Sequence, residues 1–170
     1  MEQLKIYVYG AETDKAPAIV RRVLEYVRWK YIHTTDLAEA DLAVAPLLTA
    51  FLTDEAINTP RIGTLVFHPS LLPRHRGADA IKWAFALGET YSGVTWFWPD
   101  SGIDTGDICE QEVLAILPGE TPREYYNRAV IPAAMRTLQR VLWSIQGGVP
   151  PRRVAQIREN GSYEPRMRRE

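Results

Sequence analysis

The sequence lacks most of the features that would place it outside the ordinary globular proteins. Its single cysteine, Cys109, excludes an internal disulfide, and its strand-like surroundings favour a buried structural thiol. The first residues form no long apolar run, so we expect neither a signal peptide nor a membrane span. Basic and acidic residues balance to a net charge of -1, which gives no bias toward nucleic acid or membrane surfaces. We therefore expect a cytoplasmic protein.

The remaining composition is that of one domain with a sizeable core. The chain has 170 residues, 46% of them hydrophobic, without internal repeats or low-complexity segments. Only residues 150–170 differ in composition, because they are rich in arginine and proline. We therefore divide the chain into a domain at 1–149 and a tail at 150–170. Acidic residues partly balance the basic ones in the tail, which favours a solvated arm packed loosely on the domain over a nucleic-acid contact.

Short apolar segments alternate with helical patterns along the domain. The expected strands lie at 4–9, 31–32, 41–45, 62–67, 93–98 and 108–116, and the expected helices at 17–29, 53–58, 77–88 and 121–147. Thr121-Pro122-Arg123-Glu124 has the pattern of a capping box with proline in the first turn, and Pro132 should kink or split the helix that follows. The alternation predicts an α/β fold with a mostly parallel sheet, in which ligands bind at the carboxyl ends of the strands.

Two segments carry the residues best suited to chemistry. His68 ends an apolar strand and opens the run His-Pro-Ser-Leu-Leu-Pro-Arg-His-Arg-Gly, whose two prolines fix an exposed loop. Asp104 follows 27 residues after Gly77 in the glycine-bounded turn Asp-Ser-Gly-Ile-Asp-Thr-Gly-Asp. A histidine and a carboxylate are the two titratable partners that acyl transfer needs. The aspartates of the turn do not reproduce a known metal-binding loop, so we predict no metal site.

Both segments resemble the folate-dependent formyltransferases, the family of methionyl-tRNA formyltransferase, glycinamide ribonucleotide transformylase and the sugar N-formyltransferases. The resemblance implies a Rossmann-like formyltransferase fold, with a twisted, mostly parallel sheet flanked by helices, and 10-formyltetrahydrofolate as the formyl donor. It also implies that His68 polarises the formyl group and that Asp104 handles the proton of the attacking amine. The residues implied in binding the folate are Leu52, Pro69, Ser70, Leu71, Ser101, Gly102 and Ile103. For Trp96 and Trp98, core packing is favoured over stacking on a pterin.

Two departures from the family pattern bear on activity. The family has Asn-x-His before the Pro-Ser-Leu-Leu-Pro run, and the asparagine amide donates to the formyl oxygen, whereas this chain has Val66. Loss of one such donor typically costs about 2.7–4 kcal/mol in the barrier. The stretch between Trp29 and Asp41 is also short, which implies a trimmed acceptor lobe, and the chain stops where methionyl-tRNA formyltransferases begin a second, barrel-like domain. The resemblance is good from Asp41 to about Tyr163 and only generic before Trp29.

Three functions remain open at this point. The first is formyl transfer from 10-formyltetrahydrofolate to an amine of a small molecule, with His68 and Asp104 as the catalytic pair. The second is hydrolysis of the same donor, which a trimmed acceptor lobe favours. The third is folate or ligand binding without turnover, which Val66 favours. We also expect a homodimer built from the helix at 121–145 and the strand at 108–116, without nucleic-acid or membrane partners.

Overall fold

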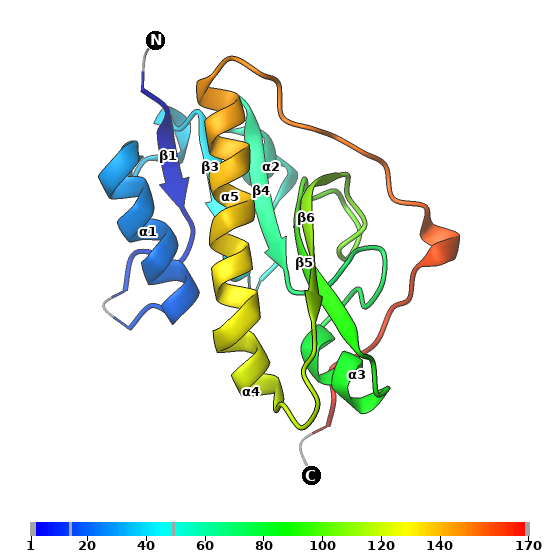
Figure 1. Cartoon of the computed structure of the whole chain (residues 1–170). Helices are drawn as coiled ribbons and strands as arrows, with labels where there is room; N and C mark the ends of the chain where they lie inside the picture. Colours follow the sequence, from blue (N-terminus) through cyan, green and yellow to red (C-terminus); the bar gives the residue numbers. More distant parts are fainter. Residues whose placement is uncertain (1–2, 14, 49, 169–170) are drawn as a thin grey trace.

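A six-stranded sheet flanked by helices forms the body of the protein (Figure 1). The computed structural model describes residues 3–13, 15–48 and 50–168. The strands are β1 (Lys5–Val8), β2 (Ile32–Thr34), β3 (Leu42–Ala45), β4 (Gly63–His68), β5 (Tyr91–Phe97) and β6 (Ile108–Ala115). They lie in the order β2-β1-β3-β4-β5-β6. The first four are mutually parallel, whereas β5 is antiparallel to β4 and β6 to β5. The predicted α/β fold with a mostly parallel sheet is confirmed.

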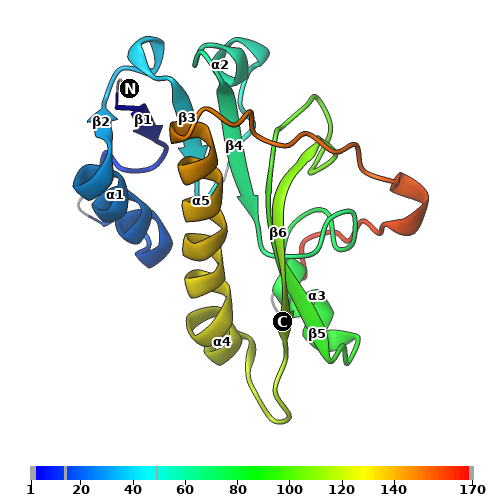
Figure 2. The ribbon, with the colours of Figure 1, turned by 45° about the horizontal axis from the view of Figure 1, so that its top comes forward.

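The helices occupy both faces of this sheet (Figure 2). They are α1 (Ala18–Lys30), α2 (Asp54–Asn58), α3 (Ala80–Ala86), α4 (Pro122–Tyr125) and α5 (Ile131–Gln146), together with the 3-10 turns η1 (Leu37–Glu39) and η3 (Arg158–Asn160) and the π-helical turn η2 (Tyr126–Val130). The amphipathic helices α1 and α5 lie side by side on one face and cover the main core. Among the residues described, no helix is both long and apolar enough to cross a bilayer.

The alternation of side chains along β4 separates two apolar clusters. Leu65 and Phe67 face α5 and belong to the main core, which also takes in Trp96, Trp98 and Cys109. Both tryptophans are at most 4% exposed, as expected of core residues. The thiol of Cys109 is also buried, as predicted, and burial raises its pKa to about 12. Val66 faces the opposite way, into a second cluster that we call the small cluster: Ala45, Val66, Leu72 and Phe97.

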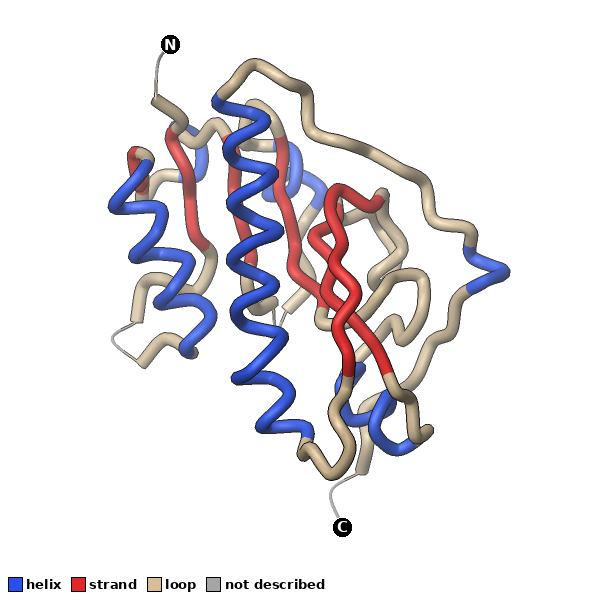
Figure 3. Tube along the Cα trace, viewed as in Figure 1, coloured by secondary structure: helices blue, strands red, loops and turns tan. Residues whose placement is uncertain are grey.

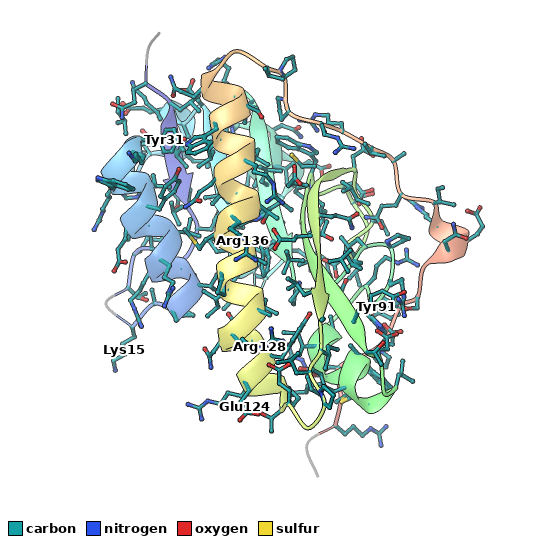
Figure 4. The ribbon with its side chains drawn as sticks, viewed as in Figure 1. Lys15, Tyr31, Tyr91, Glu124, Arg128 and Arg136 are labelled. Atoms are coloured by element: carbon teal, nitrogen blue, oxygen red, sulfur yellow. The ribbon has the colours of Figure 1, made fainter. Side chains whose placement is uncertain are left out.

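The long C-terminal helical run follows its sequence signals closely. Thr121 and Glu124 form the predicted capping box, and Pro122 occupies the first turn. The π-helical turn η2 lies directly before Ile131 and Pro132, so the run is divided where proline was expected to disturb it. The cause is that proline has no N–H to continue the α-helical hydrogen bonds. The run ends at Gly147, and Arg136 extends from α5 to Glu112 of β6 (Figure 4).

The tail forms an arm that runs from the end of α5 along the side of the sheet toward α3 (Figure 3). Its backbone pairs with β6 at Ile108 and Val154, and again with the loop after β4 at Arg76 and Tyr163. Near its end, the carbonyl of Pro165 accepts a hydrogen bond from Trp83 of α3 at 2.8 Å. The expectation of a loosely packed arm is therefore wrong. The composition of the arm indicated solvent exposure, and most of its side chains are exposed. Its backbone hydrogen bonds could not be predicted, because nearly every residue type can form them.

Candidate active site

His68 is the last residue of β4, at the carboxyl end of the parallel strands, and it is 6% exposed. Its Nε2 lies 2.7 Å from the carbonyl oxygen of His75. Because a carbonyl oxygen only accepts hydrogen bonds, Nε2 carries the hydrogen in this contact. Its Nδ1 lies 3.5 Å from Oδ2 of Asp104, which is longer than a well-formed hydrogen bond. The structure thus brings the two predicted catalytic residues together and leaves Nδ1 as the ring nitrogen available to a substrate.

The turn that carries Asp104 is held by contacts on several sides. Asp104 has a positive φ of 53°, which aspartate tolerates better than most residues, and its side chain is 20% exposed. Its Oδ2 accepts a hydrogen bond from the backbone N–H of Gly77 at 2.8 Å, which connects the turn to the loop after β4. Within the turn, Asp100 accepts from the N–H of Gly102 at 2.9 Å and from the hydroxyl of Thr105 at 2.6 Å. The carboxylate of Asp104 is therefore fixed against His68 before any ligand binds.

The Pro-Ser-Leu-Leu-Pro loop is fixed on β5 by its own polar groups. Ser70 is fully buried, and its hydroxyl donates to the carbonyl of Arg74 at 2.6 Å. Thr95 of β5 donates to the carbonyl of Ser70 at 2.7 Å and accepts from the N–H of Leu72 at 3.2 Å. The side chain of Ser70, which the resemblance placed in folate binding, is thus used inside the loop. Pro69 and Leu71 are partly exposed on the same loop, whereas Ser101, Gly102 and Ile103 on the turn of Asp104 are exposed.

Apolar side chains line the sheet face next to His68. Val66 is 4% exposed in the small cluster, two residues before His68 and on the same face of β4. Leu48 and Leu52, from the segment after β3, pack against this cluster, and Leu52 was among the predicted folate-binding residues. The structure therefore places Val66 and Leu52 on one apolar wall.

Tyr9 is the residue of this wall that the sequence did not single out. It follows β1, and its N–H donates to the carbonyl of Val44 at 2.9 Å, so it lies beside Ala45, which pairs in turn with Val66. Its ring packs against the small cluster, and its buried hydroxyl has no hydrogen-bond partner among the described residues. Burial raises the pKa of this phenol, and the carboxylate of Glu12 adds to the effect. In the sequence, Tyr9 is only one more member of an alternating strand.

Two surface hollows of the described residues lie elsewhere. One, of about 710 Å³, is at the lower end of the helical run in Figure 4 and includes Glu124 and Arg128. The other, of about 170 Å³, lies at the start of β4 beside Trp98 and Arg153. Neither hollow includes His68 or Asp104. Among the described residues, no three His, Cys, Asp or Glu side chains gather in a way that could hold a metal ion.

Comparison with known proteins finds a matching family, curated relatives and similar solved structures. Residues 9–142 match the family described as Formyl transferase. The chain is 35% identical over 168 residues to the cytosolic 10-formyltetrahydrofolate dehydrogenase of Xenopus tropicalis, a match that covers 94% of this chain but 18% of that protein. Among solved structures, HypX from Aquifex aeolicus in complex with tetrahydrofolic acid has a TM-score of 0.81 at 19% identity, covering 99% of this chain and 30% of HypX. The formyltransferase PseJ from Anoxybacillus kamchatkensis, in complex with UDP-4,6-dideoxy-4-formamido-L-AltNAc and tetrahydrofolate, has a TM-score of 0.73 at 24% identity, covering 95% of this chain and 85% of PseJ.

Proposed function

We propose that this chain, which belongs to the formyl transferase family, transfers the formyl group of 10-formyltetrahydrofolate to an amine of a small molecule. The observation that carries the proposal is the pairing of His68 and Asp104, with 3.5 Å between Nδ1 and Oδ2, at the carboxyl end of the parallel strands. The folate in the structures of HypX and PseJ, and the formamido sugar nucleotide in that of PseJ, support the choice of donor and acceptor class.

The reaction follows from the orientation of the histidine ring. Nε2–H of His68 donates to the carbonyl of His75, and in the imidazolium form Nδ1 also carries a hydrogen, which it donates to the formyl oxygen. As the amine attacks, a C–N bond forms, negative charge develops on this oxygen, and the hydrogen bond from Nδ1 strengthens. The carboxylate of Asp104 takes the proton that the attacking nitrogen loses. Collapse of the tetrahedral intermediate breaks the bond to N10 of the donor, and that nitrogen receives the proton.

The wall beside His68 suits a folate-type donor. A pterin is flat and largely apolar on its faces, with polar groups at its edges, so it needs an apolar surface with a few donors and acceptors. Leu48 and Leu52 supply apolar surface, and the unpartnered hydroxyl of Tyr9 supplies a donor. The backbone of the turn at 101–103 would line the other side, next to Asp104. These residues would hold the donor while His68 and Asp104 act on its formyl group.

Hydrolysis of the same donor is the second candidate. The observation that favours it is the 35% identity to 10-formyltetrahydrofolate dehydrogenases, which are named for the formyl donor and not for an amine acceptor. In this reaction a water takes the place of the amine, Asp104 accepts its proton, and formate leaves. The chain spans 18% of the length of these relatives, so the proposal concerns only the step that His68 and Asp104 carry out.

Turnover of 10-formyltetrahydrofolate, with and without a panel of amines that includes amino-sugar nucleotides, tests the proposal. Appearance of tetrahydrofolate with an N-formyl product supports transfer, and tetrahydrofolate with formate supports hydrolysis. Calorimetric binding of the 5-deaza analogue without turnover would leave only a binding role. His68→Ala and Asp104→Asn should each abolish turnover, whereas His33→Ala, on the edge strand β2, should leave it intact. Unchanged turnover in both site variants would refute the proposal.

A further inference from the structure

We infer that the C-terminal arm is part of the active-site framework, and that Ser162 and Glu164 act as positioning residues for His68 through His75. The expected effect on kcat rests on the proposed function, whereas the expected effect on the His68 ring does not. The arm contacts the loop that holds His68 and the turn that carries Asp104, although it lies more than 80 residues beyond His68 in sequence.

The arm pairs with the loop after β4 as if it were an added strand. The N–H of Ser162 donates to the carbonyl of Pro73 at 3.1 Å, and the N–H of Arg76 donates to the carbonyl of Ser162 at 3.0 Å. The N–H of His75 donates to the hydroxyl of Ser162 at 2.9 Å. Two backbones approach so closely here that a Cβ on Gly161 would lie 2.4 Å from the carbonyl oxygen of Pro73. Only glycine permits this approach.

The ring of His75 is clamped between two carboxylates from different parts of the chain. It is 3% exposed, and its Nε2 forms a hydrogen bond of 3.0 Å with Oε2 of Glu89. Its Nδ1 lies 3.2 Å from Oε1 of Glu164, an ion-pair distance without the angles of a hydrogen bond among the described residues. Glu89 belongs to the turn before β5 and also pairs with Arg74, whereas Glu164 belongs to the arm. His75 has a positive φ of 54°, which L-residues rarely adopt. The two carboxylates and Ser162 together hold the residue in this conformation.

The conformation of His75 determines which nitrogen of His68 faces the substrate. The carbonyl of His75 accepts from Nε2 of His68 at 2.7 Å, and in doing so it assigns the hydrogen to Nε2 and turns Nδ1 toward Asp104. The same arm reaches the other half of the pair, because Gln156 donates to the carbonyl of Asp104 at 2.9 Å and to that of Gly106 at 2.7 Å. The arm thus ties the histidine loop to the aspartate turn.

Three variants test this role. Glu164→Gln removes one charge from the clamp, Ser162→Ala removes the acceptor for the N–H of His75, and Glu159→Gln is the matched control on the exposed turn η3. Misplacement of a catalytic group by about 1 Å can lower kcat about a hundredfold, so we expect a loss of between about tenfold and a hundredfold for the first two variants. KM for 10-formyltetrahydrofolate should stay within about twofold, since neither residue touches the donor, and Glu164→Asp should recover part of the loss.

Nitrogen-15 NMR of the His68 ring separates this inference from the proposed function. In the unaltered protein Nε2 should carry the hydrogen, and in Glu164→Gln and Ser162→Ala the signals should shift toward exchange between ring forms. This readout needs no turnover, so it applies even if 10-formyltetrahydrofolate is not a substrate. Unchanged His68 signals in both variants, with thermal stability equal to that of Glu159→Gln, would overturn the inference. The same holds if kcat falls only in proportion to lost stability.

Discussion

Replacement of Val66 by asparagine tests whether the family mechanism operates at this site. Val66 is 4% exposed and its cluster partners Ala45, Leu72 and Phe97 are apolar. In the unliganded protein an asparagine here buries an amide without an assured partner, which costs about 1–3 kcal/mol. For a domain of this size, each kcal/mol lowers Tm by roughly 2–4 °C, so a fall of roughly 2–12 °C is expected. A domain with the usual 5–15 kcal/mol of stability remains folded after such a loss.

The catalytic gain should exceed this cost if the amide reaches the formyl oxygen. One donor at a developing oxyanion contributes about 2.7–4 kcal/mol, which corresponds to between about a hundredfold and a thousandfold in rate. We therefore expect Val66→Asn to be less stable and faster, whether the acceptor is an amine or water. Single-turnover release of tetrahydrofolate from 10-formyltetrahydrofolate measures the gain, and thermal unfolding measures the loss.

Val44→Asn provides the matched control. Val44 is fully buried on the neighbouring strand β3, but it faces the main core under α5 instead of the site. It should lose stability to a similar extent and gain no activity. A folded Val66→Asn variant that binds the donor and shows no gain would refute the reasoning. It would indicate that valine belongs to a site rebuilt for another substrate.

Three further predictions concern the wall, the start of β3 and association. Tyr9→Phe should weaken binding of the 5-deaza folate analogue by roughly threefold to tenfold without loss of Tm, because the hydroxyl has no hydrogen-bond partner among the described residues. Tyr7→Phe is the control, and equal affinities of Tyr9→Phe and the parent would contradict the prediction. Asp41→Asn should lower stability at pH 7 by no more than about 1 kcal/mol. Burial opposes ionisation of Asp41, but the N–H of Lys5 and the guanidinium of Arg61 outweigh burial and lower the pKa of Asp41. The difference in free energy of unfolding between variant and parent, measured by urea unfolding, should therefore shrink as the pH falls below about 4. We also predict a homodimer, since Val113 on β6 is 66% exposed and Trp143 on α5 is 68% exposed, and light scattering at micromolar concentration should detect it; a monomer alone would contradict this.

Local signals in the sequence predicted local structure well. The predicted capping box at Thr121 involves residues within three positions of one another, and Pro132 disturbs the helical run in its own neighbourhood. The position of His68 at a strand end also followed from a local pattern, namely an apolar run that meets a proline. The direction of β5 and β6 did not, because side-chain alternation is the same in parallel and antiparallel strands.

Contacts that involve backbone groups or segments far apart in the sequence were beyond prediction from one sequence. The ring of His68 is held by the backbone carbonyl of His75, and because every residue type has such a carbonyl, no sequence pattern marks this contact. The hydroxyl of Ser162 accepts a hydrogen bond from the N–H of His75, which lies 87 residues away in the sequence. The composition of the segment around Ser162 indicated only solvent exposure. Tyr9 was missed for a related reason: the alternation of its strand shows which face it occupies, but not that its hydroxyl is left without a partner.

These missed contacts change how the site is to be understood. His68 is held within its own motif, where the carbonyl of His75 fixes Nε2, whereas the aspartate turn is held by Gly77 of that first motif and by Gln156 of the arm. Under the proposed function, a pair fixed in this way is preorganised, so it requires little rearrangement when charge develops on the formyl oxygen. The pair of His68 and Asp104 alone therefore does not determine whether an amine or water attacks the formyl group. Under the proposed function that choice depends on the wall beside the pair, where Val66 has no donor to offer and the hydroxyl of Tyr9 has no hydrogen-bond partner among the described residues.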